Sequence, residues 1–158
     1  MSARRPKTSA GLLLYRKRPA GPEVLLGHLG GPLWAHRDDG AWTLPKGEYD
    51  AAVEQPQDAA RREFTEELGL PVPAGELLAL GEVVQAGGKQ VVAFALAADL
   101  DPGCVVPGTF EMVWPPRSGL VQTFPELDRV AWFTPADAAQ KVIPAQRAFL
   151  DRLVAALA

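Results

Sequence analysis

One short run of charge constrains this chain more than any other feature: the nine residues REFTEELGL, from Arg62 to Leu70. In a helix each residue advances by about 100° around the axis, so Glu63, Glu66 and Glu67 would share one face about 100° wide. The neighbouring stripe of the same helix is apolar and consists of Ala60, Phe64 and Leu68. A stripe of this kind is typical of the buried side of a helix. The run therefore predicts a helix that holds three acids at the edge of a core.

Three glutamates at this spacing repel one another by about 0.2–0.5 kcal/mol per pair on an exposed helix. The cluster is favourable only if positive charge lies over it, and hard divalent cations such as Mg²⁺ and Mn²⁺ prefer carboxylate oxygens. Arg62 and Glu66 are four residues apart, so the guanidinium can also hold one carboxylate in a fixed orientation. The alternative interpretation is a solvated acidic face, although the helix dipole disfavours negative charge towards a helix C-terminus.

The same residues resemble the signature motif of the Nudix hydrolases. That motif is a glycine, a later glutamate, and then Arg-Glu-hydrophobic-any-Glu-Glu-any-Gly-hydrophobic. The matching positions here are Gly47, Glu54, Arg62, Glu63, Phe64, Glu66, Glu67, Gly69 and Leu70. The second half fits at every position. The first half has six residues between Gly47 and Glu54, where the family usually has five.

The resemblance implies an α/β fold, a Nudix-like α/β/α sandwich with a mixed sheet, and a divalent-metal-dependent hydrolase of phosphoanhydride bonds. By the same resemblance, Glu63, Glu66 and Glu67 are metal ligands for Mg²⁺ or Mn²⁺, and the Gly47 carbonyl also contacts the metal. Glu66 acts either as a base or as the partner of Arg62. Arg62 orients the acids.

Further site residues are expected outside the motif. Nudix enzymes often draw another catalytic or metal-bound glutamate from downstream, and the two candidates are Glu111 and Glu126, with Glu111 preferred. Lys46 directly precedes Gly47 and can meet a phosphate, and Arg117 can bind phosphate oxygens. Trp34 either stacks on a base or packs within its loop. A solvated loop is the alternative for Glu111 and Arg117.

The stretch Trp-Thr-Leu-Pro-Lys-Gly before the motif, at residues 42–47, is similar to Nudix members that cut dinucleoside polyphosphates. Diadenosine tetraphosphate is therefore the preferred substrate class. Nucleoside triphosphates, ADP-ribose and nucleotide sugars stay open. A non-catalytic nucleotide-binding Nudix domain is the alternative of a different kind, and the intact glutamates argue against it.

Composition narrows the function further. The chain has 158 residues, a net charge of −3 and one cysteine, Cys104. The acidic balance argues against nucleic-acid binding, and one cysteine excludes an internal disulfide framework. No apolar run approaches the roughly 18 residues of a membrane span, and no signal peptide is evident. We expect one cytoplasmic domain over residues 1–158, with residues 1–8 as a flexible arm, a small-molecule substrate, and an oligomeric state that the sequence leaves open.

The expected elements alternate between strands and helices. Residues 9–17 and 23–29 predict an antiparallel strand pair, with Gly11 at a close backbone approach and His28 as a polar residue at a sheet edge. Residues 76–85 and 90–98 predict a hairpin with a solvated Lys89 at its tip. The remaining expectations are a helix over 56–68, an irregular segment over 102–125, a strand over 130–134, and helices over 135–142 and 144–156.

Overall fold

The computed structural model describes residues 8–158, and its central element is a seven-stranded mixed sheet. Its main path runs in the order β3-β2-β1-β6-β5, while β4 pairs with β1 and β9 pairs with β2. The β1–β6 pair is parallel and the other pairs of this sheet are antiparallel. The strands of this sheet are β1 Thr8–Arg18, β2 Gly21–Leu29, β3 Trp42–Thr43, β4 Lys46–Glu48, β5 Leu78–Val84, β6 Gln90–Ala97 and β9 Leu127–Phe133.

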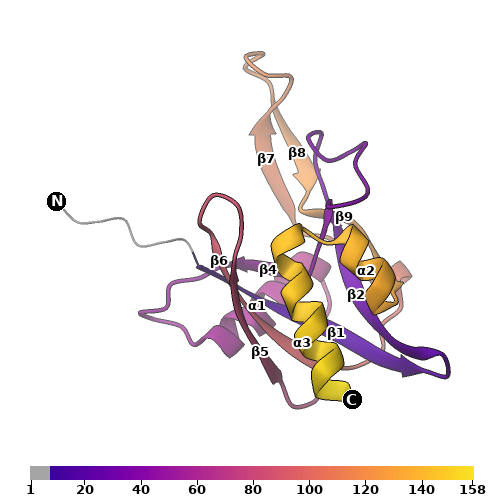
Figure 1. The fold of residues 1–158 in the computed structure, drawn as a ribbon. Helices are drawn as coiled ribbons and strands as arrows, with labels where there is room; N and C mark the ends of the chain where they lie inside the picture. Colours follow the sequence, from indigo (N-terminus) through magenta and orange to yellow (C-terminus); the bar gives the residue numbers. More distant parts are fainter. Residues whose placement is uncertain (1–7) are drawn as a thin grey trace.

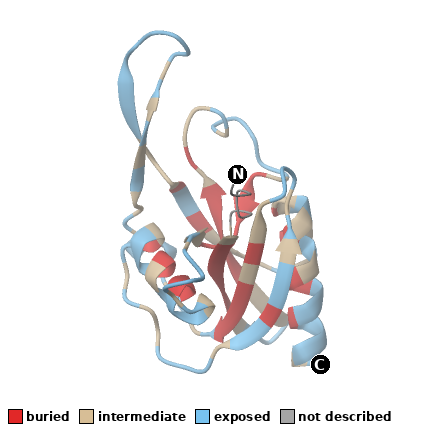
Figure 2. Ribbon diagram, turned by 90° about the vertical axis from the view of Figure 1, so that its left-hand side faces the viewer, coloured by how far each residue is buried: buried red, intermediate tan, exposed pale blue. Residues whose placement is uncertain are grey.

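Helices cover both faces of this sheet (Figure 1). The helical segments are α1 Pro56–Leu68, η1 Pro102–Cys104, α2 Pro135–Lys141, η2 Pro144–Gln146 and α3 Arg147–Leu157. Strand β1 is apolar on both sides because it lies between the two layers: Leu12 and Leu14 pack with Phe64 of α1, while Leu13 packs with Phe149 of α3. Figure 2 shows the buried sheet enclosed between these two helices. The α/β/α sandwich with a mixed sheet is therefore confirmed.

Helix α1 begins and ends where the sequence predicts. Pro56 occupies the first turn, where its missing N–H costs nothing. Gly69 follows in the left-handed conformation with φ of 66°, and its N–H donates to the Thr65 carbonyl at 2.8 Å. A glycine adopts this conformation without a Cβ penalty.

The segment 102–125 is not irregular, and that prediction is wrong. Strands β7 Thr109–Val113 and β8 Val121–Pro125 pair as an antiparallel two-stranded sheet that projects away from the body in Figure 1. The proline and glycine residues that flank these strands masked a period-two pattern, in which Phe110 and Met112 fall on one face and Glu111 on the other. Other boundaries shift by a few residues: β9 begins at Leu127, and η2 precedes α3.

Two further expectations are corrected. His28 is fully buried inside the sheet, because β2 pairs with β9 along one edge and with β1 and β3 along the other. Its ring nitrogens lie 2.9 Å from an Asp128 carboxylate oxygen and 2.6 Å from the Arg37 carbonyl oxygen. The flexible arm proposed for residues 1–8 falls mostly outside the described residues, but Thr8 already belongs to β1. The close approach at Gly11 is confirmed, since a Cβ there would overlap Leu44 and the Pro45 carbonyl.

A buried amide ties the C-terminal layer to the segment that leads into β4. Gln146 is fully buried, accepts a hydrogen bond from the Leu44 N–H at 3.0 Å, and donates to Thr43 Oγ1 at 2.8 Å and to Gln85 Oε1 at 3.0 Å. Its side chain therefore holds the backbone just before Lys46 and Gly47 in place. No helix among residues 8–158 has the length and apolarity that crossing a bilayer requires.

Replacing Gln146 by alanine should lower the free energy of unfolding by about 2 kcal/mol, because a buried backbone N–H and a hydroxyl lose their partner. For a chain of this size the melting temperature should fall by about 4–8 °C. The matched control is Gln140→Ala, since Gln140 is exposed on α2 and should change stability by less than about 0.5 kcal/mol. Equal melting curves for the two variants, measured by circular dichroism, would contradict the role given to Gln146.

Candidate active site

Helix α1 lies directly against strand β4, and the two meet at Gly47 and Glu63. A Cβ built on Gly47 would overlap the Glu63 carboxylate, so only glycine lets this acid approach the strand. Glu63 is 7% exposed, and burial raises the pKa of its carboxyl. A nearly buried acid is thus packed against backbone, which is costly unless a positive charge compensates it.

Arg62 supplies part of that compensation, because its guanidinium binds three carboxylates. Its guanidinium donates in a fork to Glu54 at 2.9 and 3.0 Å. The same guanidinium donates to Glu63 at 2.8 Å and to Glu66 at 3.2 Å. Hydrogen bonds from Arg62 hold the pKa of Glu54 below its usual value. Despite the six-residue spacing from Gly47, Glu54 therefore reaches Arg62, and Arg62 orients acids as the sequence predicts.

Glu67 is the acid that Arg62 does not hold. Its backbone carbonyl accepts from the Gly108 N–H at 3.3 Å, but its carboxylate has no hydrogen bond or ion pair among the described residues. Burial, then the charges of Glu126 and Glu63, raise the pKa of Glu67 to about 8. A carboxyl kept out of water without a partner is a frequent mark of a functional site.

Glu63 and Glu67 line a cavity of about 400 Å³, together with residues from other strands and turns. Its lining residues are Leu29, Thr43, Lys46, Gly47, Glu48, Glu63, Glu67, Lys89, Glu126 and Leu127. The α1 acids and strand β4 meet here with the ends of β2 and β3, the β5–β6 turn and the start of β9. Both signs of charge are present, which suits a site for a metal ion together with an anionic ligand.

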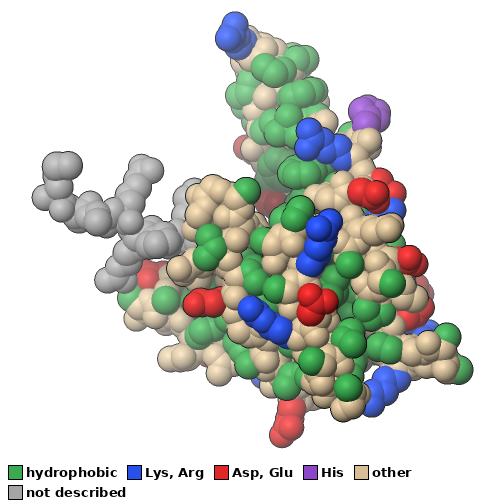
Figure 3. Space-filling view, in the orientation of Figure 1, with side chains coloured by type: hydrophobic (Ala, Val, Ile, Leu, Met, Phe, Trp, Pro, Cys, Tyr) green, Lys and Arg blue, Asp and Glu red, His purple; other side chains and the backbone are tan. Residues whose placement is uncertain are grey.

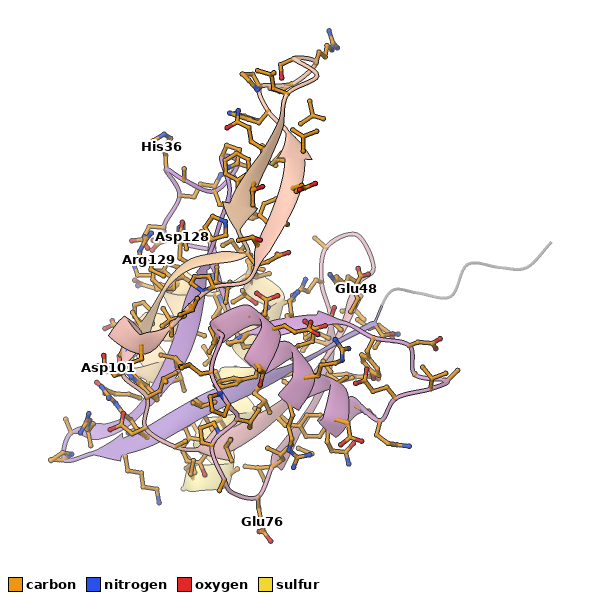
Figure 4. The ribbon with its side chains drawn as sticks, turned by 180° about the vertical axis from the view of Figure 1, so that it is seen from behind. His36, Glu48, Glu76, Asp101, Asp128 and Arg129 are labelled. Atoms are coloured by element: carbon orange, nitrogen blue, oxygen red, sulfur yellow. The ribbon has the colours of Figure 1, made fainter. Side chains whose placement is uncertain are left out.

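Two lysines give the cavity its positive side. Burial and then the charge of Lys89 lower the pKa of Lys46 to about 8. Lys89 is partly exposed and lies 3.5 Å from Glu48, so the side chain is paired and not fully solvated as expected, although residues 86–88 of the turn are exposed. The turn between β5 and β6 curves back toward β4, and Figure 4 shows Glu48 beside that turn. No local pattern in the sequence signals this curvature.

The structure brings together only some of the predicted site residues. One cavity is lined by Lys46, Gly47, Glu63 and Glu67. Glu66 is exposed and does not line this cavity, but Arg62 donates hydrogen bonds to both Glu66 and the cavity residue Glu63. Of the two downstream candidates, Glu126 lines the cavity and Glu111 does not. Glu111 is exposed on the projecting β7–β8 hairpin, so its position does not support the preference for it.

Trp34 and Arg117 also lie outside this cavity. Arg117 is exposed in the turn of the β7–β8 hairpin, with φ of 63°. Trp34 is half-buried in the loop between β2 and β3, packs against the core, and contacts a second, smaller cavity. Trp42, which begins the stretch at residues 42–47, is a core residue with 4% exposure.

The donor set of the main cavity fits a hard divalent cation. The available ligand atoms are carboxylate and backbone oxygens, which Mg²⁺ and Mn²⁺ prefer. Among residues 8–158 no three histidine, cysteine, aspartate or glutamate side chains already stand close enough to enclose an ion. Because Glu63 and Glu66 both accept hydrogen bonds from Arg62, loading the site would involve rotation of these side chains.

Comparison with protein families decides the class of this site. The family model described as the NUDIX domain matches residues 5–153, nearly the whole chain. This chain belongs to the Nudix family. With its acidic helix intact, this Nudix protein is a pyrophosphohydrolase, a hydrolase that acts on acid anhydrides. Nudix hydrolases generally use divalent metal ions. A comparison with curated protein sequences gave no match.

Three solved structures illustrate the likeness of this Nudix protein to known folds. A crystal structure of a C. elegans Ap4A hydrolase binary complex is 25% identical, with a TM-score of 0.62 and coverage of 96% of this chain and 97% of that one. The M. smegmatis Nudix hydrolase RenU is 28% identical, with a TM-score of 0.56 and coverage of 95% and 84%. The NUDIX domain of Shewanella oneidensis NrtR, complexed with ADP ribose, is 14% identical with a TM-score of 0.64 over 99% and 91%, and shows the fold alone.

If Glu67 is a metal ligand, as the sequence predicts, metal binding should release protons near neutral pH. Because the pKa of Glu67 is about 8 without metal, most molecules carry a proton there at pH 7 that a cation must displace. The apparent Kd for Mn²⁺ should fall about tenfold from pH 6 to pH 7 and level off above pH 8. Calorimetry in two buffers of different ionisation enthalpy measures the proton count directly. A pH-independent Kd with no buffer dependence would contradict the assignment.

Proposed function

We propose that this protein hydrolyses a phosphoanhydride bond in dinucleoside polyphosphates such as diadenosine tetraphosphate, with Mg²⁺ or Mn²⁺. The observation that carries the proposal is the pairing, in one cavity, of the unpartnered acid Glu67 with two lysines, Lys46 and Lys89. The likeness to an Ap4A hydrolase over nearly the full length of both chains supports this choice of substrate. The Trp-Thr-Leu-Pro-Lys-Gly stretch before β4 supports it independently.

In this proposal the two sides of the cavity have separate tasks. Glu63, Glu66 and Glu67 hold the cation, with the Gly47 carbonyl as a further ligand. When bound, a divalent cation neutralises phosphate oxygens and activates water for attack. Arg62 keeps Glu63 and Glu66 oriented through its hydrogen bonds.

The lysines act on the anionic substrate. Lys46 and Lys89 face the cavity from β4 and from the β5–β6 turn, so they can contact oxygens at two points of a polyphosphate chain. An ammonium group in a partly dry cavity attracts phosphate more strongly than one in bulk water. Positioning and charge stabilisation are the main demands that phosphoryl transfer makes on a protein. Arg117 lies on the outlying hairpin, where it can meet only a distant part of a long substrate.

Glu126 takes the place that the sequence had suggested for Glu111. It lines the cavity opposite α1, and its charge contributes to the raised pKa of Glu67. We therefore propose Glu126 as the additional catalytic or metal-binding glutamate. In this role it completes the acidic side of the cavity from the link between β8 and β9, directly before β9.

A panel of compounds tests the proposal: diadenosine tetraphosphate, nucleoside triphosphates, ADP-ribose and a nucleotide sugar, each with Mg²⁺ or Mn²⁺. We expect the highest kcat/KM for diadenosine tetraphosphate, phosphate-ended products by anion-exchange chromatography, and no turnover in excess EDTA. Glu126→Gln should lower kcat/KM by about tenfold or more, and Glu111→Gln should leave it nearly unchanged. Preference for another compound of the panel would change the substrate class.

Binding of these nucleotides without turnover would contradict hydrolysis altogether. It would favour the non-catalytic nucleotide-binding alternative. The cytoplasmic location predicted from the sequence stays part of the same proposal, as does the absence of nucleic-acid and membrane partners.

A further inference from the structure

We propose that the small cavity between the β2–β3 loop and the β7–β8 hairpin binds a nucleobase of the substrate and accepts different bases with little discrimination. This inference rests on the proposed function and names a subsite for it. The cavity has a volume of about 180 Å³ and is lined by residues 30–34 of the loop and by Phe110 and Met112 of β7. It is separate from the cavity that holds the acids and lysines.

The geometry of this subsite depends on a glycine. Gly31 has φ of 91°, and a Cβ there would lie 2.8 Å from the tip of the Phe110 ring. The glycine thus lets the loop approach the hairpin while leaving a gap beside the ring. Phe110 is supported from its own hairpin by Phe124, with ring centroids 6.0 Å apart. Phe110 and Met112 face the loop, because alternate residues of a strand share one face.

The subsite borders the main cavity. Leu29 lines the main cavity and Gly30 lines the subsite, so the two linings meet at consecutive residues, about 3.8 Å apart along the backbone. The Gly30 N–H donates to the carbonyl of Glu126 at 3.0 Å, and Glu126 also lines the main cavity. A ligand whose phosphates lie between Lys46 and the acids can therefore place an attached group in the subsite.

The chemistry of the lining selects a planar apolar group. Pro32, Leu33, Trp34, Phe110 and Met112 present rings and aliphatic or thioether atoms. Ligand pockets for whole drug-sized molecules are about 300–1,000 Å³, so a cavity of about 180 Å³ suits one ring system of a larger ligand. Bases stack on aromatic side chains whatever their sequence identity, because every base has a π-face. Figure 3 shows hydrophobic side chains gathered along the projecting hairpin.

The same lining explains why the subsite should accept different bases. Strong rejection of a wrong ligand requires buried polar groups that are left unpaired by it. The side chains of the subsite have no charged group, and the indole N–H of Trp34 is their one hydrogen-bond donor. Arg37, at the edge, lies over the Trp34 ring at 5.5 Å from its centroid. Without hydrogen bonds to the edges of the base, affinity should depend mainly on the stacking area of the base. Differences in affinity between bases should therefore be small.

Binding of AMP in excess EDTA tests the subsite without turnover. Leu33→Asp and Phe110→Ala should each weaken the affinity for AMP by about tenfold, measured by calorimetry. Leu33 is 62% exposed, so its replacement places charge at the subsite without disturbing the core. Val113→Ala is the matched control, because Val113 lies on the same strand and outside the subsite.

Kinetics with Mg²⁺ give a second readout. On diadenosine tetraphosphate, Leu33→Asp should raise KM by about tenfold and change kcat by less than about threefold, because the base is remote from the bond that breaks. Wild-type kcat/KM on the diguanosine and diuridine tetraphosphates should fall within about twentyfold of the adenine compound. A larger preference for one base would overturn the claim of tolerance.

The measurements distinguish a wrong subsite from a wrong assignment of hydrolase activity. Unchanged AMP affinity in folded Leu33→Asp and Phe110→Ala would overturn the subsite, even if the wild type splits diadenosine tetraphosphate. Weakened AMP affinity in both variants would support the subsite, even if no compound were hydrolysed. Melting curves of both variants establish that the protein tested is folded.

Discussion

Replacing Glu67 by glutamine is expected to lower kcat/KM by about a hundredfold or more, the largest effect of any single change in this cavity. The carboxylate is half-buried, has no partner in the described chain, and faces Lys46 across the cavity. Glutamine keeps the shape but supplies neither the charge nor the second oxygen that a hard cation requires. Steady-state rates on diadenosine tetraphosphate with Mg²⁺ measure the loss.

Although Glu67→Gln lowers activity, it should raise the free energy of unfolding of the metal-free protein. Burial raises the pKa of Glu67 to about 8 in the folded protein, from an ordinary value of 4.5. Between these values the unfolded chain has lost a proton that the folded chain keeps, so the free energy of unfolding falls as pH rises from 4.5 to 8. Glu67→Gln removes this slope. Without metal, it should be more stable than wild type by about 2 kcal/mol at pH 8, and by much less at pH 5.

Glu76→Gln is the control for both measurements. Glu76 is exposed between α1 and β5, away from Glu48 in Figure 4. Its amide variant should match the wild type in rate and in stability at both pH values. A Glu67→Gln protein with wild-type activity would remove this residue from the mechanism, and one that is less stable than wild type at pH 8 would contradict the buried, unpaired state of its carboxyl.

Replacing Arg62 by alanine is expected to lower kcat/KM by about 10- to 100-fold, although the side chain need not touch the substrate. Arg62 donates to Glu54, Glu63 and Glu66, so its loss leaves three acids without their shared cation. Glu63 is affected most because it is nearly buried against Gly47. We expect weaker Mn²⁺ binding in calorimetry together with the slower rate.

The adjacent arginine provides a matched control. Arg61 is exposed on the same helix, and its one ion pair is with Asp58 at 3.7 Å. Arg61→Ala should therefore change activity by less than about twofold, as expected for loss of an exposed pair. Arg62→Lys should recover only part of the activity, because an ammonium cannot reproduce the fork to Glu54. Equal activity in the Arg61 and Arg62 alanine variants would show that the network has no role in orienting the acids.

Much of the fold could be predicted because its signals are local. The length of α1 follows from Pro56 at its start and Gly69 at its end, and both act through their own backbone conformation. The strands β1, β2, β5 and β6 were evident from apolar runs between turn residues. The β7–β8 hairpin was missed because the flanking prolines and glycines suggested an irregular segment. Its alternating Phe110 and Met112 were the available signal.

The sequence by itself determined the chemistry of α1, since the spacing of Glu63, Glu66 and Glu67 on one helix depends only on helix geometry. Tertiary structure alone decided which distant residues meet these acids. Lys89 enters the cavity because the β5–β6 turn curves toward β4, and Glu126 enters in place of Glu111 because β9 begins beside β2 while β7 projects away. Contacts between residues so far apart in the chain depend on strand pairing and curvature, for which no local pattern of residues provides a signal.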